Sequence, residues 1–107
     1  MTPAIVATQE SEVGRPVAVW IEDVEGTIVR GVAESVTNGG AHIRLAGHPE
    51  FGRGAGVALR ISFDPESPTV AATARVSWIR AEDGQAECGV EWTGAHPGVE
   101  EWLASRN

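Results

Sequence analysis

Apolar side chains recur at every second position along much of this chain. In the clearest stretch, Val57 to Phe63, apolar residues alternate with Ala58, Arg60 and Ser62. A period of two puts successive side chains on opposite faces of an extended strand, whereas a helix repeats its apolar positions every three to four residues. The pattern therefore predicts a mainly β protein in which each strand has one buried face and one solvated face.

Six segments carry this alternation, and turn-forming residues separate them. The predicted strands are 16–23, 27–35, 41–45, 57–64, 70–78 and 86–92. Short strands joined by short turns remove their unpaired edges by closing into a barrel. At 107 residues the chain has room for one hydrophobic core. We expect an all-β fold, a six-stranded antiparallel β-barrel.

Local turn chemistry supports these boundaries. The strongest turn signal is Asn38-Gly39-Gly40, because Asn and Gly reach positive φ at little steric cost. A proline and four glycines in 46–56 predict a loop there. The turn at 38–40 is therefore expected to be a hairpin corner with positive φ.

The end of the chain changes period. Val99, Trp102 and Leu103 have helical spacing, Pro97 suits a first turn, and an acidic pair follows near the positive end of the helix dipole. We predict a short C-terminal α-helix over 97–105. Residues 1–14 show no sustained period and are expected to form a flexible leader, so the barrel domain is assigned to 15–107.

Nothing in the sequence resembles a membrane span or a signal peptide, so the protein is expected to be cytoplasmic and without a membrane partner. The single cysteine, Cys88, has no partner for an internal disulfide. It falls on an inward-facing position, which indicates a small buried side chain rather than a reactive thiol.

The formal net charge is −7, and all eight cationic side chains are arginines. Proteins that bind nucleic acid usually carry a basic excess that neutralises phosphates. DNA and RNA are therefore not expected partners. Single arginines can still bind a small anion through the planar donor fork of the guanidinium.

No arrangement of residues predicts catalysis, a metal or a cofactor. His42, His48 and His96 fall in no ligand spacing with one another or with Cys88. The glycines of 52–56 are followed by a strand and no lysine, which excludes a phosphate-binding loop of the nucleotide-hydrolysing type. The chain is expected to bind rather than to catalyse.

Four tryptophans stand out in a chain without tyrosine. Trp78, Trp92 and Trp102 fall on faces predicted to be buried. Trp20 falls opposite the apolar face of its strand, so it is a candidate interaction anchor, although cover on both faces of that strand is the simpler explanation.

The order of these elements resembles a PilZ domain, a bacterial module of six antiparallel strands and a helix that commonly senses cyclic di-GMP. The resemblance covers residues 15 to about 103. It rests on 32–43, which form a strand, a turn and a strand, and on three further segments: Gly56-Val57-Ala58-Leu59-Arg60-Ile61-Ser62-Phe63, Ala74-Arg75-Val76-Ser77-Trp78 and Cys88-Gly89-Val90-Glu91-Trp92.

The resemblance implies two ligand motifs, and both are incomplete here. In the Asp/Asn-x-Ser-x-x-Gly motif, Ser35 replaces the acidic or amide residue, Thr37 replaces serine and Gly40 matches. In the Arg-x-x-x-Arg motif, Ser11 replaces the first arginine and Arg15 matches the second. Losing an arginine and an acceptor should cost about 3 kcal/mol, or roughly a hundredfold in affinity.

Two functional hypotheses follow from this resemblance. The first is a signalling adaptor for motility or second-messenger pathways that acts through protein partners, with cyclic di-GMP binding weak or lost. The second is a working cyclic di-GMP receptor that uses Arg15 together with substitute arginines, for which Arg44, Arg60 and Arg75 are candidates on outward strand faces. The simpler interpretation of these three is solubilising surface charge with cross-strand carboxylate pairs.

Overall fold

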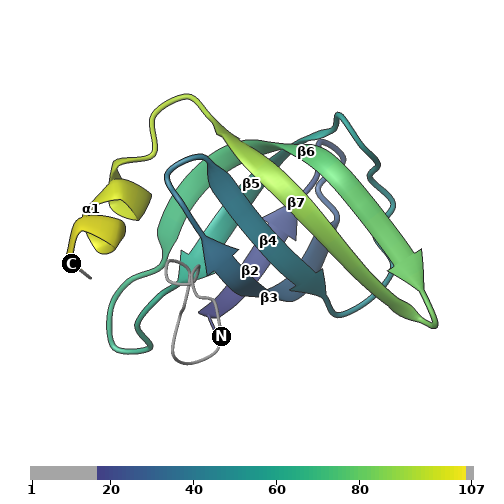
Figure 1. The fold of residues 1–107 in the computed structure, drawn as a ribbon, viewed down its shortest axis with the longest axis horizontal. Helices are drawn as coiled ribbons and strands as arrows, with labels where there is room; N and C mark the ends of the chain where they lie inside the picture. Colours follow the sequence, from purple (N-terminus) through teal and green to yellow (C-terminus); the bar gives the residue numbers. More distant parts are fainter. Residues whose placement is uncertain (1–16, 106–107) are drawn as a thin grey trace, which may run out of the picture.

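The computed structural model describes residues 17–105. Six strands form a closed barrel in the order β2-β3-β4-β7-β6-β5, and every neighbouring pair is antiparallel (Figure 1). The strands are β2 (Val17–Glu22), β3 (Ile28–Val36), β4 (Gly40–Leu45), β5 (Gly56–Ser62), β6 (Val70–Glu82) and β7 (Gln85–Thr93). The predicted six-stranded antiparallel barrel is confirmed.

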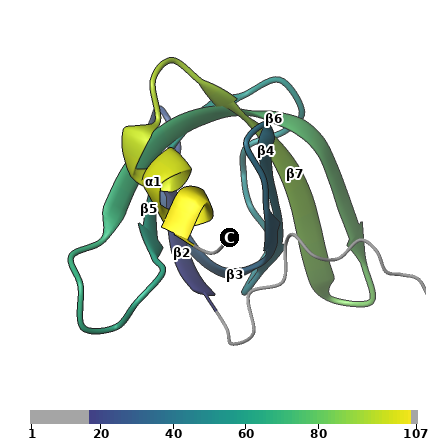
Figure 2. The ribbon, with the colours of Figure 1, turned by 60° about the vertical axis from the view of Figure 1, so that its left-hand side comes forward.

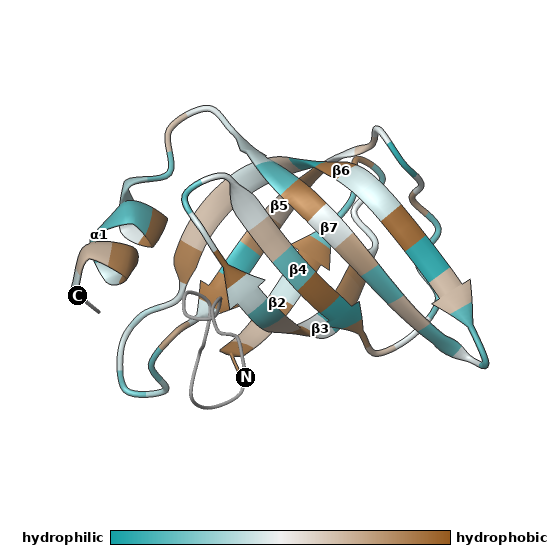
Figure 3. Ribbon diagram, viewed as in Figure 1, coloured by the Kyte–Doolittle hydropathy of each residue, from teal (hydrophilic) through white to brown (hydrophobic). Residues whose placement is uncertain are grey.

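The alternation in the sequence becomes the inside and the outside of this barrel. Hydrophobic and hydrophilic positions follow one another along the strands (Figure 3), and the apolar set fills the interior. The buried core consists of Val17, Val19, Ile21, Ala33, Val36, Ile43, Leu45, Phe51, Val57, Leu59, Ile61, Phe63, Ala72, Ala74, Val76, Ala86, Cys88, Val90 and Val99. Phe51 enters this core from the predicted loop 46–56, where no alternation marked it.

Two irregularities shift the alternation by one residue. The pairing register changes on β3 between Ala33 and Ser35, and on β6 between Val76 and Trp78. A bulge inserts an extra residue and turns the following side chains to the other face. The second shift makes the sequence-based placement of Trp78 wrong, because its side chain is on the outer face and 38% exposed.

The turn between β3 and β4 forms where expected but for a different reason. Asn38, Gly39 and Gly40 all have negative φ, so the expectation of positive φ is wrong. Gly40 is required by close packing instead, because a β-carbon there would overlap the Val90 carbonyl oxygen on β7. Positive φ occurs at Asp83 and Gly84 (55° and 77°), the two-residue connection between β6 and β7.

The predicted helix is confirmed as α1 (Pro97–Ser105). It lies across one end of the barrel (Figure 2), where Val99 is fully buried and Trp102 stacks on Phe63 with ring centroids 4.0 Å apart. Trp92 and Trp102 are partly buried against the core. Within 17–105, no helix has the length and apolar character needed to span a bilayer.

Candidate functional site

A shallow hollow lies on the outer face of the barrel beside the β3–β4 turn. Strands β3, β4, β6 and β7 all contribute to its lining, which includes Ser35, Thr37, Gly40, His42 and Trp78. The structure therefore brings together the three described motif positions, Ser35, Thr37 and Gly40. Ser11 and Arg15 lie outside the described residues.

Thr37 organises the turn. Its hydroxyl oxygen accepts hydrogen bonds from the amides of Gly39 and Gly40, at 3.1 and 3.2 Å. Its backbone amide donates to the Gly40 carbonyl at 2.8 Å, and its carbonyl accepts from the Trp92 indole at 2.9 Å. Threonine thus supplies a hydroxyl that holds the turn, and the Trp92 bond fastens the turn to β7.

Three arginines on β4 and β6, two of the strands that line the hollow, face carboxylates. Arg44 forms an ion pair with Glu34, and Nη2 of Arg75 lies 3.8 Å from Oε1 of Glu91. Arg80, which was not among the predicted candidates, lies 3.5 Å from Glu87. Each of these guanidinium groups already faces a negative charge.

Arg60, the third predicted substitute, lies elsewhere on the barrel. It is on β5, where its guanidinium donates to the Thr69 hydroxyl at 3.4 Å, and it lines a different hollow from Ser35 and Thr37. The structure therefore separates Arg60 from the motif positions.

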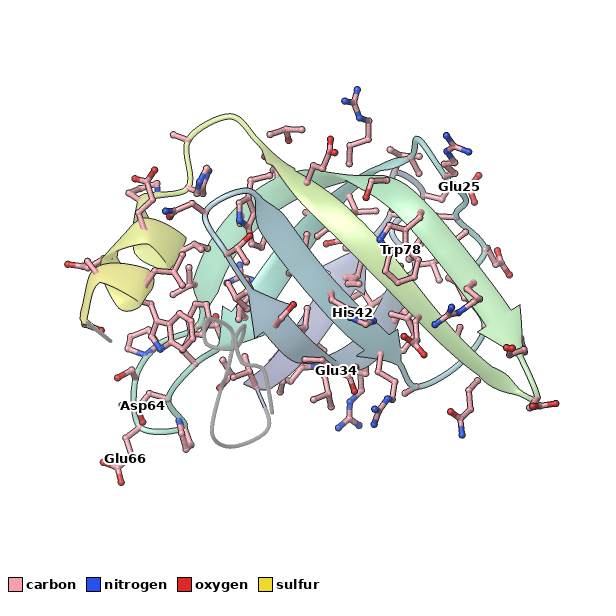
Figure 4. The ribbon with its side chains drawn as sticks, in the orientation of Figure 1. Glu25, Glu34, His42, Asp64, Glu66 and Trp78 are labelled. Carbon is pink, nitrogen blue, oxygen red and sulfur yellow. The ribbon has the colours of Figure 1, made fainter. Side chains whose placement is uncertain are left out.

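A cluster of three titratable side chains adjoins the hollow through His42. His42 on β4 lies between Glu34 of β3 and Glu87 of β7, and its Nε2 atom is 2.7 Å from the Glu87 carboxylate. Figure 4 shows His42 on the barrel surface between Glu34 and Trp78, and the His42 and Trp78 rings meet edge to face at 5.2 Å. The hydrogen bond from His42 lowers the pKa of Glu87, and the nearby Arg80 lowers it further.

Sequence reasoning did not find this cluster. Its members come from three strands, and Glu34 and Glu87 are far apart in the chain. Glu34 reaches the histidine because it lies at the β3 irregularity between Ala33 and Ser35. The register of neighbouring strands, which local spacing does not show, brings the cluster together.

A second outer surface surrounds Trp20. In the strand register, Trp20 on β2 is opposite Arg30 of β3 on one side and Arg60 of β5 on the other. Trp20 is half-buried, and both arginines are exposed. Neither arginine forms an ion pair with any residue in the described range 17–105. We call Arg30, Trp20 and Arg60 the Trp20 row.

The cysteine and the other two histidines lie outside the lining of the hollow and outside the cluster around His42. Cys88 is fully buried, and desolvation raises the pKa of its thiol to about 11. His96 lies 3.7 Å from Glu100 one helical turn further on. His48 is in the loop between β4 and β5. The burial of Cys88 agrees with the sequence-based interpretation of a structural residue.

Comparison with known proteins gives one family. The sequence model of the PilZ domain matches residues 9–105. Among curated protein sequences, no significant match is found.

Solved structures of this family share the fold at low sequence identity. The PilZ domain of YcgR from Escherichia coli, solved with cyclic di-GMP, is 16% identical with a TM-score of 0.69, over 89% of this chain and 81% of that one. The motility inhibitor MotI/DgrA of Bacillus subtilis is 20% identical with a TM-score of 0.70, over 95% of this chain but only 49% of that one.

A third structure extends this comparison. The PilZ domain of CeSA from a cellulose-synthesizing bacterium is 24% identical with a TM-score of 0.60, over 84% of this chain and 87% of that one. The match of the family model to most of the chain agrees with the barrel, the turn and the terminal helix. The chain belongs to the PilZ domain family.

Proposed function

We propose that this PilZ domain is a cytoplasmic signalling adaptor that acts through protein partners in bacterial motility or second-messenger signalling, and that its binding of cyclic di-GMP is weak or lost. The observation that carries the proposal is that three arginines on β4 and β6, two of the strands that line the hollow beside the motif turn, already face carboxylates. Arg44, Arg75 and Arg80 each face a carboxylate, at Glu34, Glu91 and Glu87 respectively.

Charge explains why this arrangement disfavours the dinucleotide. A ligand with two phosphates needs unengaged cations and tolerates few nearby anions, because charge-assisted hydrogen bonds provide much of the binding energy. Glu91 lines the hollow, and Glu34 and Glu87 lie beside His42, which also lines it. Ser35 stands where the family motif has an acidic or amide side chain. A phosphate arriving here would have to displace existing ion pairs.

The Trp20 row supports protein binding. Tryptophan and arginine are enriched among residues that dominate the energy of protein interfaces. The two flanking arginines give the row a positive charge on a chain with net charge −7. Exposed Ile28 and Val32 on β3 add apolar area to the same outer face. We expect a partner that offers carboxylates around an apolar contact.

The structural relatives support a role in motility or cyclic di-GMP signalling. One is a PilZ domain solved with cyclic di-GMP, and another is an inhibitor of motility. This chain has one arginine fewer in the ligand motif, and its substitute arginines Arg44 and Arg75 face carboxylates. A family member with these changes is expected to keep the role of binding a partner. This is a non-enzymatic role.

Calorimetric titration with cyclic di-GMP tests the ligand part. We expect no binding, or binding weaker than micromolar, for the wild type. The double substitution Ser11→Arg with Ser35→Asp restores both motif positions and should raise affinity at least about tenfold. Ser67→Asp in the loop between β5 and β6 is the control. Sub-micromolar wild-type binding that Arg15→Ala abolishes would overturn the proposal.

Affinity capture from the native host tests the protein part. The expected result is a specific partner retained by the wild type, lost with Trp20→Ala and weakened with Arg60→Glu. Arg53→Glu, in the loop before β5, changes the same charge away from the Trp20 row and should keep the partner. Equal capture by all four proteins would contradict the assigned surface.

The alternative is a working receptor, and the geometry of the turn favours it. Thr37 keeps the hydroxyl and Gly40 keeps the close approach to β7, so the frame of the motif is intact. In this alternative Arg15, with Arg44 or Arg75 released from its carboxylate, would hold the phosphates. The calorimetric titration distinguishes the two functions.

A further inference from the structure

We propose that Glu34, His42 and Glu87 form a binding site for a divalent transition-metal ion of the zinc class on the outer face of the barrel. Each side chain offers one ligand atom, and these atoms all lie within 4.8 Å of one another. The site belongs to this chain's own side chains and does not depend on whether the chain binds cyclic di-GMP or a protein partner.

The geometry suits one ion. Nε2 of His42 is 2.7 Å from Oε1 of Glu87 and 3.9 Å from Oε1 of Glu34. Zinc ligands in a tetrahedral site lie about 2.0 to 2.1 Å from the metal, so neighbouring ligand atoms are about 3.3 Å apart. Small side-chain rotations reach this spacing, since the Glu34 and Glu87 side chains are 31% and 28% exposed.

The donor set selects the class of ion. An imidazole nitrogen favours zinc, copper and nickel over calcium or magnesium, which prefer oxygen ligands alone. Two carboxylates add negative charge to balance the ion. Three protein ligands on an exposed face leave the fourth position to water.

An outer partner orients the Glu34 carboxylate. Arg44 pairs with Oε2 of Glu34, which leaves Oε1 of that carboxylate turned toward His42. Arg80 Nη2 instead lies 3.5 Å from Oε1 of Glu87, the oxygen that also faces His42, so Arg80 shares the charge of this ligand atom. Outer hydrogen-bond partners of this kind fix the ligand geometry of metal sites, and they also share the carboxylate charge with the ion.

The backbone holds the ligands in place. His42 is on β4, the middle strand of three, with β3 on one side and β7 on the other. The irregularity at Ala33/Ser35 brings Glu34 into the group, and bulges of this kind redirect side chains near binding sites. Because all three ligands lie on paired strands, the site is largely formed before an ion arrives.

Isothermal titration of chelator-treated, tag-free protein with zinc chloride tests the proposal. We expect one ion per chain, with affinity reduced at least about tenfold by His42→Gln and by Glu87→Gln. The matched controls are His48→Gln and His96→Gln, which remove the other two histidines and should leave the affinity unchanged. Circular dichroism confirms that each variant is folded.

Two further measurements make the outcome decisive. Zinc should change tryptophan emission through Trp78, whose ring is 5.2 Å from His42, and Trp78→Phe should abolish this change without abolishing binding. Excess magnesium should not compete. The proposal is overturned if wild-type protein binds no zinc, if His42→Gln binds as tightly as wild type, or if a control histidine carries the binding.

Discussion

The indole of Trp78 lies directly over Gly89 on the neighbouring strand, where a β-carbon would come within 2.6 Å of the indole Cε2 atom. The irregularity at Val76/Trp78 turns this tryptophan outward, and the missing side chain at residue 89 gives it a flat backbone to cover. The ring then borders both the hollow beside the motif turn and the Glu34–His42–Glu87 cluster. Trp78 thus links the two candidate sites.

Gly89→Ala should displace this indole while the barrel remains folded. The added methyl group meets the ring of an outward-facing side chain, so the ring can move without disturbing the core. We expect a red-shifted tryptophan emission and a loss of about 1 kcal/mol in the free energy of unfolding. Trp78→Phe serves as the reference: if Gly89→Ala shifts the emission equally in that background, another tryptophan is responsible.

The strands and the helix could be predicted because their signals are local. Alternation from Val57 to Phe63 and helical spacing after Pro97 each describe one element by itself. The exposure of Trp78 could not be predicted, because its cause is the register between β6 and β7. A bulge depends on what the neighbouring strand requires, and a single strand's sequence does not contain that information.

The candidate site also combines features that the sequence predicts with features that it does not. Ser35, Thr37 and Gly40 are close in sequence, so their association in one turn could be anticipated. Cross-strand pairing of Arg44 with a carboxylate could also be anticipated, but the identity of the partners, Glu34 for Arg44 and Glu87 for Arg80, could not, because it depends on which strands are neighbours. The metal-ligand cluster is hidden for the same reason, since three strands contribute to it.

Gly40→Ala should be far more damaging than Gly39→Ala, although the two glycines are adjacent. A β-carbon at residue 40 would overlap the Val90 carbonyl group, which is backbone and cannot move without opening the pairing of β4 with β7. At residue 39 the nearest atom would be the Thr37 hydroxyl at 3.9 Å. We expect the free energy of unfolding to fall by about 2 to 3 kcal/mol for Gly40→Ala and to change by no more than about 0.5 kcal/mol for Gly39→Ala. Urea unfolding measures both, and equal losses would contradict the close-approach explanation.

Thr37→Val should loosen the motif turn, whereas Thr37→Ser should preserve it. Valine keeps the shape but removes the hydroxyl that accepts from the Gly39 and Gly40 amides. The expected cost is about 1 kcal/mol, since these partly exposed amides regain water as a partner. Hydrogen exchange of the two amides should accelerate in the valine variant only. Unchanged exchange would mean that the Trp92 contact alone fixes the turn.

Glu87→Gln should remove stability that depends on pH. The pKa of Glu87 is lowered below its ordinary value of 4.5 in the folded chain, mainly by the hydrogen bond to His42. A lowered carboxyl pKa stabilises the folded state when the group is ionised, and this contribution disappears as the pH falls through the folded pKa. The stability difference between wild type and Glu87→Gln should therefore shrink below about pH 4.5.

Urea midpoints between pH 5.5 and pH 3, measured with a chelator present, follow this difference. Repeating the comparison in a His42→Ala background removes the hydrogen bond that is the principal cause of the lowered pKa, so the difference should be smaller there. A difference that grows as the pH falls, or that is unaffected by His42→Ala, would refute the assigned cause.

Cys88 should be unreactive until the barrel opens. Its side chain is fully buried, and desolvation raises the thiol pKa from 9.0 to about 11. The thiolate is the reactive form, so at pH 8 the folded chain holds about a hundredfold less of it than an ordinary cysteine. Ellman's reagent should react slowly with native protein and rapidly in urea. The Cys88 thiol has a lower pKa in the unfolded chain than in the folded chain. Alkaline pH above 9.0 should therefore also destabilise the barrel, and Cys88→Ala should reduce that sensitivity. Comparable labelling rates with and without urea would show that β7 opens readily, contrary to the closed barrel described above.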